Sequence, residues 1–247
     1  MNKIKIAVLE ARVYASRLPG KVMMPLSGIP MLEHIVNRIK NSKKIDKIVI
    51  ATTKNSEDDL IEILANKMNI EVFRGSKNNV MSRVLGATKK HKNSILIQVT
   101  GDNPFIESKV IDQAIEVIEN RNVDYVCNHL PRKVPLGCEV RVYNRDSLVK
   151  LNKRNLSFYH KSNVTSIFYA KESDYKIINI NTDRDLSGKK YRLTVDEVKD
   201  YILVEHIYSK LYKGKYISLA EVLKYLSKNK NISQINSTVI QKKIIEG

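Results

Sequence analysis

Hydrophobic and polar positions in the first half of the chain follow two different periods. Short apolar runs, which are typical of buried strands, alternate with segments whose apolar residues recur every three or four positions, as in amphipathic helices. The apolar runs predict strands at residues 4–9, 47–52, 71–73, 94–99 and 125–127. The segments between them predict helices at residues 30–41, 80–91 and 109–119, and one more that begins at Ser56.

This alternation predicts an α/β fold. Strands joined by helices of this length form right-handed crossovers, so the sheet is mostly parallel and helices cover both of its faces. We therefore expect a Rossmann-like, three-layer αβα arrangement. No linker rich in Gly, Ser or Pro divides the chain, and we expect a single domain over residues 1–247.

The pattern changes after Asn128. Residues 129–137 contain two prolines and predict a loop, residues 139–143 alternate as a strand does, and residues 150–165 are polar and partly helical in pattern. Further strands are predicted at residues 176–179 and 191–195, and helices at residues 197–211 and 218–227. We interpret residues 130–170, approximately, as a small β arm inserted in the domain.

The composition is strongly basic. The chain has 43 Lys and Arg against 26 Asp and Glu, which gives a formal net charge of +17 at pH 7. Such a charge permits nucleic-acid binding. The lysines are spread along polar helix faces rather than gathered in one stretch, so we do not expect nucleic acid as a partner. Attraction of small anionic substrates explains part of the charge.

Targeting and redox signals are weak. No stretch approaches the roughly 18 consecutive apolar residues that a membrane span needs, and the N-terminal segment lacks the pattern of a signal peptide. Cys127 and Cys138 lack the spacing of a metal site. We therefore expect a cytoplasmic protein with reduced thiols and no membrane partner.

A basic segment follows the first predicted strand. It carries Arg12, Arg17 and Lys21 with the small residues Ala15 and Ser16, and a predicted helix follows it. A strand, a basic loop and a helix in succession are typical of phosphate binding, because backbone N–H groups and a helix N-terminus attract anions. Neither the dinucleotide nor the P-loop glycine fingerprint is present, so a basic surface loop without a ligand stays open as the alternative.

Two carboxylates follow predicted strands. Asp102 comes after the strand at residues 94–99, and Asp196 comes after the strand at residues 191–195. Ligands of an open parallel sheet bind beyond the carboxyl ends of its strands, and a few carboxylates with phosphate oxygens and water suit Mg²⁺. Structural alternatives are a turn role for Asp102 and a helix N-cap for Asp196.

Several of these segments resemble one enzyme family. Residues 11–12 (Ala-Arg) and 16–21 (Ser-Arg-Leu-Pro-Gly-Lys) resemble the signature of the CMP-sugar synthetases, cytidylyltransferases that activate Kdo, sialic acid and related acidic sugars. The residues of this segment are most similar to those of the spore coat polysaccharide biosynthesis branch. Residues 100–104 (Thr-Gly-Asp-Asn-Pro) and 192–196 (Arg-Leu-Thr-Val-Asp) are similar to the family's two metal-binding segments. Residues 73–76, with Val80, Ser82 and Arg83, are similar to a segment near the nucleotide base.

The resemblance implies a Mg²⁺-dependent nucleotidyltransferase with a GT-A-like fold. Such an enzyme transfers CMP from CTP to an acidic sugar with release of pyrophosphate, for surface polysaccharide biosynthesis, and forms a homodimer through the inserted arm. The implied roles are catalytic for Arg12, Lys21 and Asp102; nucleotide binding for Ala11, Arg12, Ser16, Arg17, Lys21, Arg74 and Gly101; metal binding for Asp102 and Asp196; and acceptor binding for Gly137 and Glu139. For Arg74, a surface ion pair is the structural alternative.

The chain departs from the family pattern in two places. Tyr14 stands where many relatives have a more Gly- and Ser-rich turn, and Ser162 and Asn163 replace a Glu-His pair on the acceptor side. Three alternative functions stay open. They are a nucleotidyltransferase with another nucleotide or a non-sugar acceptor, a nucleotide-sugar-binding glycosyltransferase, and a basic nucleic-acid-binding protein. Pro104 argues against the glycosyltransferase, because it stands where an Asp-x-Asp motif would place its second Asp.

Overall fold

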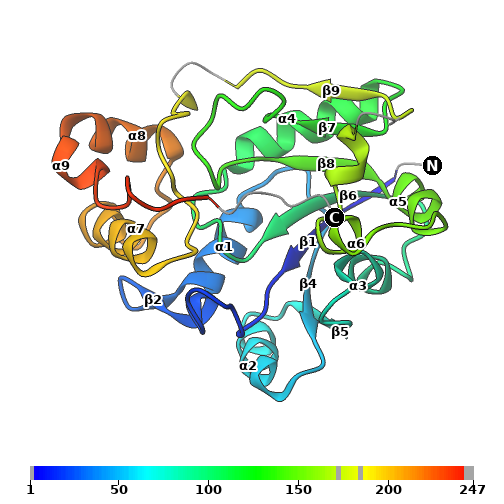
Figure 1. Ribbon diagram of the computed structural model, residues 1–247, viewed down its shortest axis with the longest axis horizontal. Coiled ribbons are helices and arrows are strands. Elements are labelled where there is room, and N and C mark those ends of the chain that lie inside the picture. The colour runs from blue at the N-terminus through cyan, green and yellow to red at the C-terminus, as the bar shows by residue number, and fades with distance from the viewer. Residues whose placement is uncertain (1–2, 171–173, 183–185, 242–247) are drawn as a thin grey trace.

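The computed structural model describes residues 3–170, 174–182 and 186–241 (Figure 1). These residues form a seven-stranded central sheet with the strand order β5-β4-β1-β6-β8-β7-β9. Its strands are β1 Ile4–Glu10, β4 Lys47–Thr53, β5 Glu71–Gly75, β6 Ser94–Thr100, β7 Tyr125–Cys127, β8 Arg141–Asn144 and β9 Ile177–Asn179. A separate hairpin pairs β2 Pro25–Leu26 with β3 Ile29–Pro30.

Most strand pairs of the central sheet are parallel. β1 lies between β4 and β6 and is parallel to both, and β5 and β9 extend the sheet in parallel at its two edges. β8 is antiparallel to both of its neighbours, β6 and β7. The prediction of an α/β fold with a mostly parallel sheet is thus confirmed. The segment expected as an inserted arm places its strand, β8, inside this sheet.

Helices cover both faces of the sheet. One face packs against α1 Met31–Lys40, α2 Asp59–Lys67, α4 Ser108–Asn120, α7 Val198–Leu211 and α8 Leu219–Lys228, and α9 Lys230–Ser233 follows α8. The other face packs against α3 Val80–Ala87 and α5 Arg145–Asn152, with α6 Phe158–Ser162 against α3. Short 3₁₀ turns are η1 Lys21–Met23, η2 Ser56–Asp58 and η3 Ser166–Tyr169. None of the described helices has the length and apolarity that a membrane span requires.

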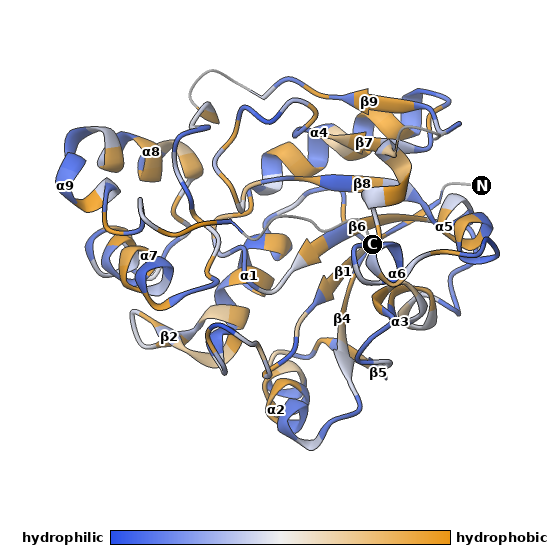
Figure 2. Ribbon diagram, viewed as in Figure 1, coloured by the Kyte–Doolittle hydropathy of each residue, from blue (hydrophilic) through white to orange (hydrophobic). Residues whose placement is uncertain are grey.

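The period-2 alternation of the strands produces the two halves of the core. In β1, Ala7 and Leu9 belong to one buried cluster, while Ile6 and Val8 belong to the cluster on the opposite face. Figure 2 shows β1, β4 and β6 as mainly hydrophobic, whereas the surrounding helices carry both hydrophobic and hydrophilic residues. This is the pattern expected of a sheet buried on both faces.

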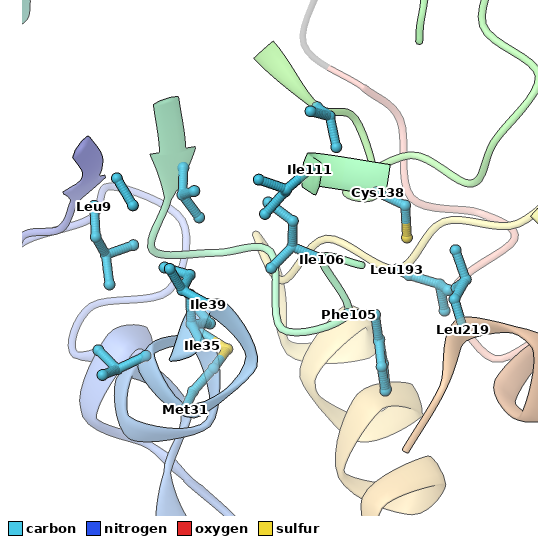
Figure 3. Packing of buried hydrophobic residues seen from close by; sticks show 14 of the residues in the cluster. Leu9, Met31, Ile35, Ile39, Phe105, Ile106, Ile111, Cys138, Leu193 and Leu219 are labelled. Carbon is cyan, nitrogen blue, oxygen red and sulfur yellow. The ribbon is translucent and has the colours of Figure 1, made fainter. Parts of the chain in front are cut away.

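The predicted strand at residues 191–195 is wrong. The segment makes a single bridge between Leu136 and Arg192 and is otherwise held by isolated backbone hydrogen bonds, such as Val195 N–H to the Asp102 carbonyl oxygen at 2.8 Å. Leu193 lies in the core with Cys138 and Leu219 (Figure 3). Apolar and polar residues alternate along this segment as in a strand, but Leu193, Thr194 and Val195 are all buried, and the neighbouring segment is a loop rather than a sheet edge.

Gly137 lets this irregular segment lie close to the loop before β8. Its φ is +95°, and a Cβ atom added to it would lie 2.5 Å from the backbone N of Thr194. Such a distance is well inside van der Waals contact, and an L side chain also disfavours this φ. Gly137 therefore fixes the distance between two loops, the second of which leads directly to Asp196.

We expect Gly137→Ala to destabilise the protein more than Gly214→Ala. Gly214 has a φ of +74° with no atom within 4 Å of an added Cβ, so its substitution costs only the left-handed conformation, about 1–2 kcal/mol. The Gly137 variant adds a backbone clash and should lose at least about 1 kcal/mol more free energy of unfolding, measured by urea denaturation. Equal losses in the two variants would show that the close approach to Thr194 is unimportant.

Candidate active site

A cleft of about 570 Å³ opens where β1 and β6 end. The predicted nucleotide and metal residues that line it are Ala11, Arg12, Ser16, Arg17, Lys21, Gly101, Asp102 and Asp196. A second hollow, of about 610 Å³, lies between Lys40 and Glu71, where β4 and β5 begin. Because open parallel sheets bind ligands beyond the carboxyl ends of their strands, the first cleft is the candidate active site.

Lys21 connects the basic loop to both predicted metal ligands. Its Nζ atom donates hydrogen bonds to Asp102 Oδ2 at 3.0 Å, to Asp196 Oδ1 at 2.9 Å and to the Val195 carbonyl oxygen at 2.7 Å. Burial by itself would lower the pKa of Lys21, but the two carboxylates outweigh it and raise the pKa above its ordinary value. The ammonium group is therefore a buried part of the site and not a solvated loop charge.

Two arginines also contact Asp196. Arg17 Nη2 lies 3.0 Å and Arg192 Nη2 lies 2.8 Å from Asp196 Oδ2. Burial alone would raise the pKa of Asp196, but the positive charges of Lys21, Arg17 and Arg192 together lower it. Asp196 is thus held ionised at the wall of the cleft by two cations of the basic loop and by Arg192.

Asp200 supports this arrangement, and sequence reasoning missed it. Its fully buried carboxylate accepts hydrogen bonds from Arg192 Nε at 2.9 Å, from Asp196 N–H at 3.0 Å and from Glu197 N–H at 3.1 Å. Glu197 is the N-cap of α7 and forms a capping box with Asp200. The alternative role of Asp196 as the N-cap is therefore wrong, and its carboxylate faces the cleft. An acidic residue three positions after Glu197 was the available signal.

Asp102 follows β6 in a tight turn. The side-chain bond that closes this turn is made by Asn103, whose Nδ2 donates to Thr100 Oγ1 at 2.8 Å. The Asp102 carboxylate accepts from Lys21 instead. The turn therefore presents Asp102 to the cleft without using its side chain as a cap.

Arg12 and Arg74, two of the predicted nucleotide ligands, differ in their surroundings. Arg12 lines the cleft, is exposed and makes no side-chain hydrogen bond or ion pair within the described part of the chain. Arg74 donates to the carbonyl oxygens of Thr53 and Asn55 at 3.0 and 2.6 Å, and it pairs with Glu62 at 2.9 Å. The structure does not bring Arg74 to the other predicted site residues.

Arg83, which belongs to the segment that resembles the family's region near the nucleotide base, lines the cleft. It lies on α3, three positions after Val80, and both residues line the cleft. Its Nη1 donates to the Ser76 carbonyl oxygen at 2.8 Å, while its buried Nε has no partner among the described residues. The segment from residue 73 onward thus contributes a guanidinium to the site, but from the following helix.

The predicted acceptor residues lie outside the lining of the cleft. Glu139 is buried and accepts from Gly137 N–H at 2.9 Å, with Arg132 Nε at 3.9 Å. Their acceptor role stays a prediction.

The two departures from the family pattern have different positions. Ser162 and Asn163 line the cleft, so this change concerns the site. Tyr14 is 49% exposed and does not line the cleft. The ammonium of Lys77, which does line it, lies 4.8 Å from the centre of the Tyr14 ring. Tyr14 thus reaches the site through a cation–π contact with a cleft residue.

Glu10, at the end of β1, is a further cleft residue that the sequence did not single out. Its Oε1 accepts from Gln98 Nε2 at 2.8 Å. Burial raises the pKa of Glu10 to about 7, although Arg83 and Arg141 act in the opposite direction. A carboxyl group with this pKa exists in both protonation states near neutral pH.

We expect Glu10→Gln to remove one component of the pH dependence of stability. The folded protein holds the Glu10 proton up to about pH 7, whereas the unfolded chain releases it near pH 4.5. Stability therefore falls as the pH rises between these two values, by up to about 3 kcal/mol, and is constant above them. Glutamine keeps a hydrogen-bond acceptor for Gln98 but does not titrate.

Urea denaturation of both proteins from pH 4.5 to pH 8 measures this component. The free energy of unfolding of the variant relative to the natural chain should rise with pH across this window. A constant difference would show that Glu10 has an ordinary pKa.

Comparison with known proteins agrees with this arrangement. A family model described as cytidylyltransferase matches residues 6–244. The spore coat polysaccharide biosynthesis protein SpsF of Bacillus subtilis is 30% identical, with 93% of this chain and 96% of that protein covered. A 3-deoxy-manno-octulosonate cytidylyltransferase of Francisella tularensis subsp. novicida is 27% identical, with 88% and 89% covered.

The same similarity is seen in three dimensions. The structure of a cytidylyltransferase from Leptospira borgpetersenii serovar Hardjo-bovis superposes with a TM-score of 0.89 at 27% identity, and the match covers 97% of this chain and 100% of that one. Both the sheet that carries the cleft and the basic loop at its mouth lie within the matched region. From its sequence, its fold and the residues gathered in its cleft, this chain belongs to the cytidylyltransferase family and is a nucleotidyltransferase.

Proposed function

We propose that this protein is a Mg²⁺-dependent cytidylyltransferase that transfers CMP from CTP to an acidic sugar, with release of pyrophosphate, for surface polysaccharide biosynthesis. The observation that carries the proposal is the convergence of the basic loop and two carboxylates on one point, the Lys21 ammonium. We further propose a cytoplasmic homodimer assembled through residues 130–170.

The donor set at this point fits Mg²⁺. No group of three His, Cys, Asp or Glu side chains gathers around a metal position among the described residues. Asp102 and Asp196 alone would hold the ion, and Mg²⁺ commonly takes one or two carboxylates and completes its shell with phosphate oxygens and water. A cation already lies between these carboxylates in the form of the Lys21 ammonium, at 3.0 and 2.9 Å. When bound, the ion neutralises charge on the phosphates.

The basic loop supplies the remaining positive charge. Arg12 has no protein partner among the described residues and is free to meet a triphosphate. In the ligand-free state, Lys21 pairs with the carboxylates of Asp102 and Asp196. Once a metal ion neutralises these carboxylates, the Lys21 ammonium becomes available to phosphate oxygens. Arg17 pairs with Asp196 at 3.0 Å and orients it.

The acceptor oxygen then attacks the α-phosphorus in line, and pyrophosphate departs. Such a reaction asks the protein mainly for positioning and charge neutralisation. The residues around Lys21 can provide both the positioning and the charge neutralisation.

Pyrophosphate release tests the proposal. We expect release from CTP, but not from ATP, GTP or UTP, when 3-deoxy-manno-octulosonate or N-acetylneuraminate is the acceptor and Mg²⁺ is present. Release from a different nucleotide would support the alternative of another nucleotidyltransferase. The absence of release from CTP with every acidic acceptor would overturn the proposal.

We expect Lys21→Ala to lower turnover about 10²- to 10³-fold, because one preorganised cation at the developing charge is lost. The KM for the acceptor should change little, since Lys21 contacts Asp102, Asp196 and the Val195 carbonyl oxygen and none of the predicted acceptor residues. Steady-state pyrophosphate release measures both quantities. Lys92→Ala removes an exposed lysine just before β6, at the opposite end of the sheet, and serves as the control for net charge. Unchanged turnover in the Lys21 variant would contradict its assignment.

A further inference from the structure

The C-terminal segment, which we define as residues 230–241, returns to the loop in front of α7. After α9 it runs back past α7 toward the middle of the molecule (Figure 1). Ile232 and Ile235 pack against the larger buried cluster, and the side chain of Gln241 accepts a hydrogen bond from Arg192. The segment is therefore attached both to the core and to the loop that leads to the cleft.

Asn236 is the buried polar residue of this segment. Its side chain is only 4% exposed, and its Nδ2 donates to Asp200 Oδ1 at 2.8 Å and to the Arg192 carbonyl oxygen at 3.0 Å. Both N–H groups of the amide are thus used. Asp196 lies midway between Arg192 and Asp200 in the sequence. The two hydrogen bonds of Asn236 therefore join the two ends of the loop that carries Asp196.

The orientation of the Asp200 carboxylate depends on Asn236. Asp200 Oδ2 accepts from Arg192 Nη2 at 3.1 Å and from the N–H groups of Asp196 and Glu197 at 3.0 and 3.1 Å. Asp200 Oδ1 accepts only from Arg192 Nε, at 2.9 Å, and from Asn236 among the described residues. Without Asn236, Oδ1 keeps one partner, and the carboxylate is free to turn away from the backbone of Asp196.

Arg192 extends this dependence to the Asp196 side chain. Its Nη2 lies 2.8 Å from Asp196 Oδ2 and 3.1 Å from Asp200 Oδ2, so that one nitrogen bridges the two carboxylates. A displacement of Asp200 therefore moves the guanidinium that contacts Asp196. Buried networks of this kind respond as a unit, because each hydrogen bond polarises and orients the next.

We propose that Asn236 is a positioning residue of the metal site, which acts through Asp200 and Arg192 to hold the Asp196 carboxylate in the orientation that binds the ion. This inference rests on the proposed function, because it concerns a metal ligand assigned there. It makes the C-terminal segment a part of the active site, although none of residues 230–241 lines the cleft.

Metal binding can be measured without any reaction. Water-proton relaxation enhancement reports protein-bound Mn²⁺, which is titrated into the natural protein and its variants with and without CTP. Loss of an outer-shell partner typically weakens metal affinity about 10- to 100-fold, and we expect about tenfold for Asn236→Ala because it acts through two further residues.

Asn229→Ala is the matched control. Asn229 Nδ2 donates to the Tyr225 carbonyl oxygen at 2.8 Å, just before the C-terminal segment and without a contact to Asp200. Its Mn²⁺ affinity should stay within about twofold of the natural protein, because no outer-shell contact of Asp196 is lost.

Thermal stability separates positioning from a structural role. Both variants lose side-chain hydrogen bonds, so both should lower the Tm. If Asn236→Ala lowers the Tm but binds Mn²⁺ as tightly as the natural protein, or if both variants lose affinity equally, the proposal is overturned. Should Asn236→Ala fail to fold, Asn236→Ser keeps one donor and should still weaken Mn²⁺ binding, whereas unchanged affinity in this variant would count against the proposal.

Turnover gives a second measurement and distinguishes this proposal from the proposed function. Asn236→Ala should raise the Mg²⁺ concentration at half-maximal rate about tenfold and leave the KM for the acceptor within about twofold. If CTP gives no pyrophosphate with any acceptor, the proposed function fails, but weaker Mn²⁺ binding by Asn236→Ala still supports the role of Asn236. Normal release with an unchanged Mg²⁺ requirement in the variant overturns the role of Asn236 alone. The absence of Mn²⁺ binding by the natural protein, with and without CTP, overturns it as well.

Discussion

The site depends on the contact of one ammonium group with two carboxylates. Lys21 Nζ lies 3.0 Å from Asp102 and 2.9 Å from Asp196, and it joins the loop after β1, the turn after β6 and the segment before α7. Two carboxylates that contact the same ammonium group are close enough to repel each other, and the cation between them offsets this repulsion. In the ligand-free cleft, the Lys21 ammonium therefore neutralises the two carboxylates. A bound metal ion would neutralise the same two carboxylates.

The segment around Asp196 has its own support, which the sheet does not supply. Asp200 accepts hydrogen bonds from two backbone N–H groups and from Arg192, and Arg192 in turn contacts Asp196. Gly137 allows the loop before β8 to approach Thr194 closely. The part of the cleft around Asp196 is thus a loop fixed by buried polar contacts, and we expect a change in any of them to displace the Asp196 carboxylate.

Most of the sheet and much of the cleft could be predicted from the sequence. The period of hydrophobic and polar positions is a local property of the sequence. It therefore revealed most strands, the main helices and the polar residues that follow β1 and β6. The segment at residues 191–195 was misleading because alternation of apolar and polar residues does not say whether the neighbouring segment is a strand. Arg74 and Arg83 look alike in the sequence. Only the packing of distant elements decided that the first pairs with α2 and the second reaches the cleft, because charge pairing is a non-local property.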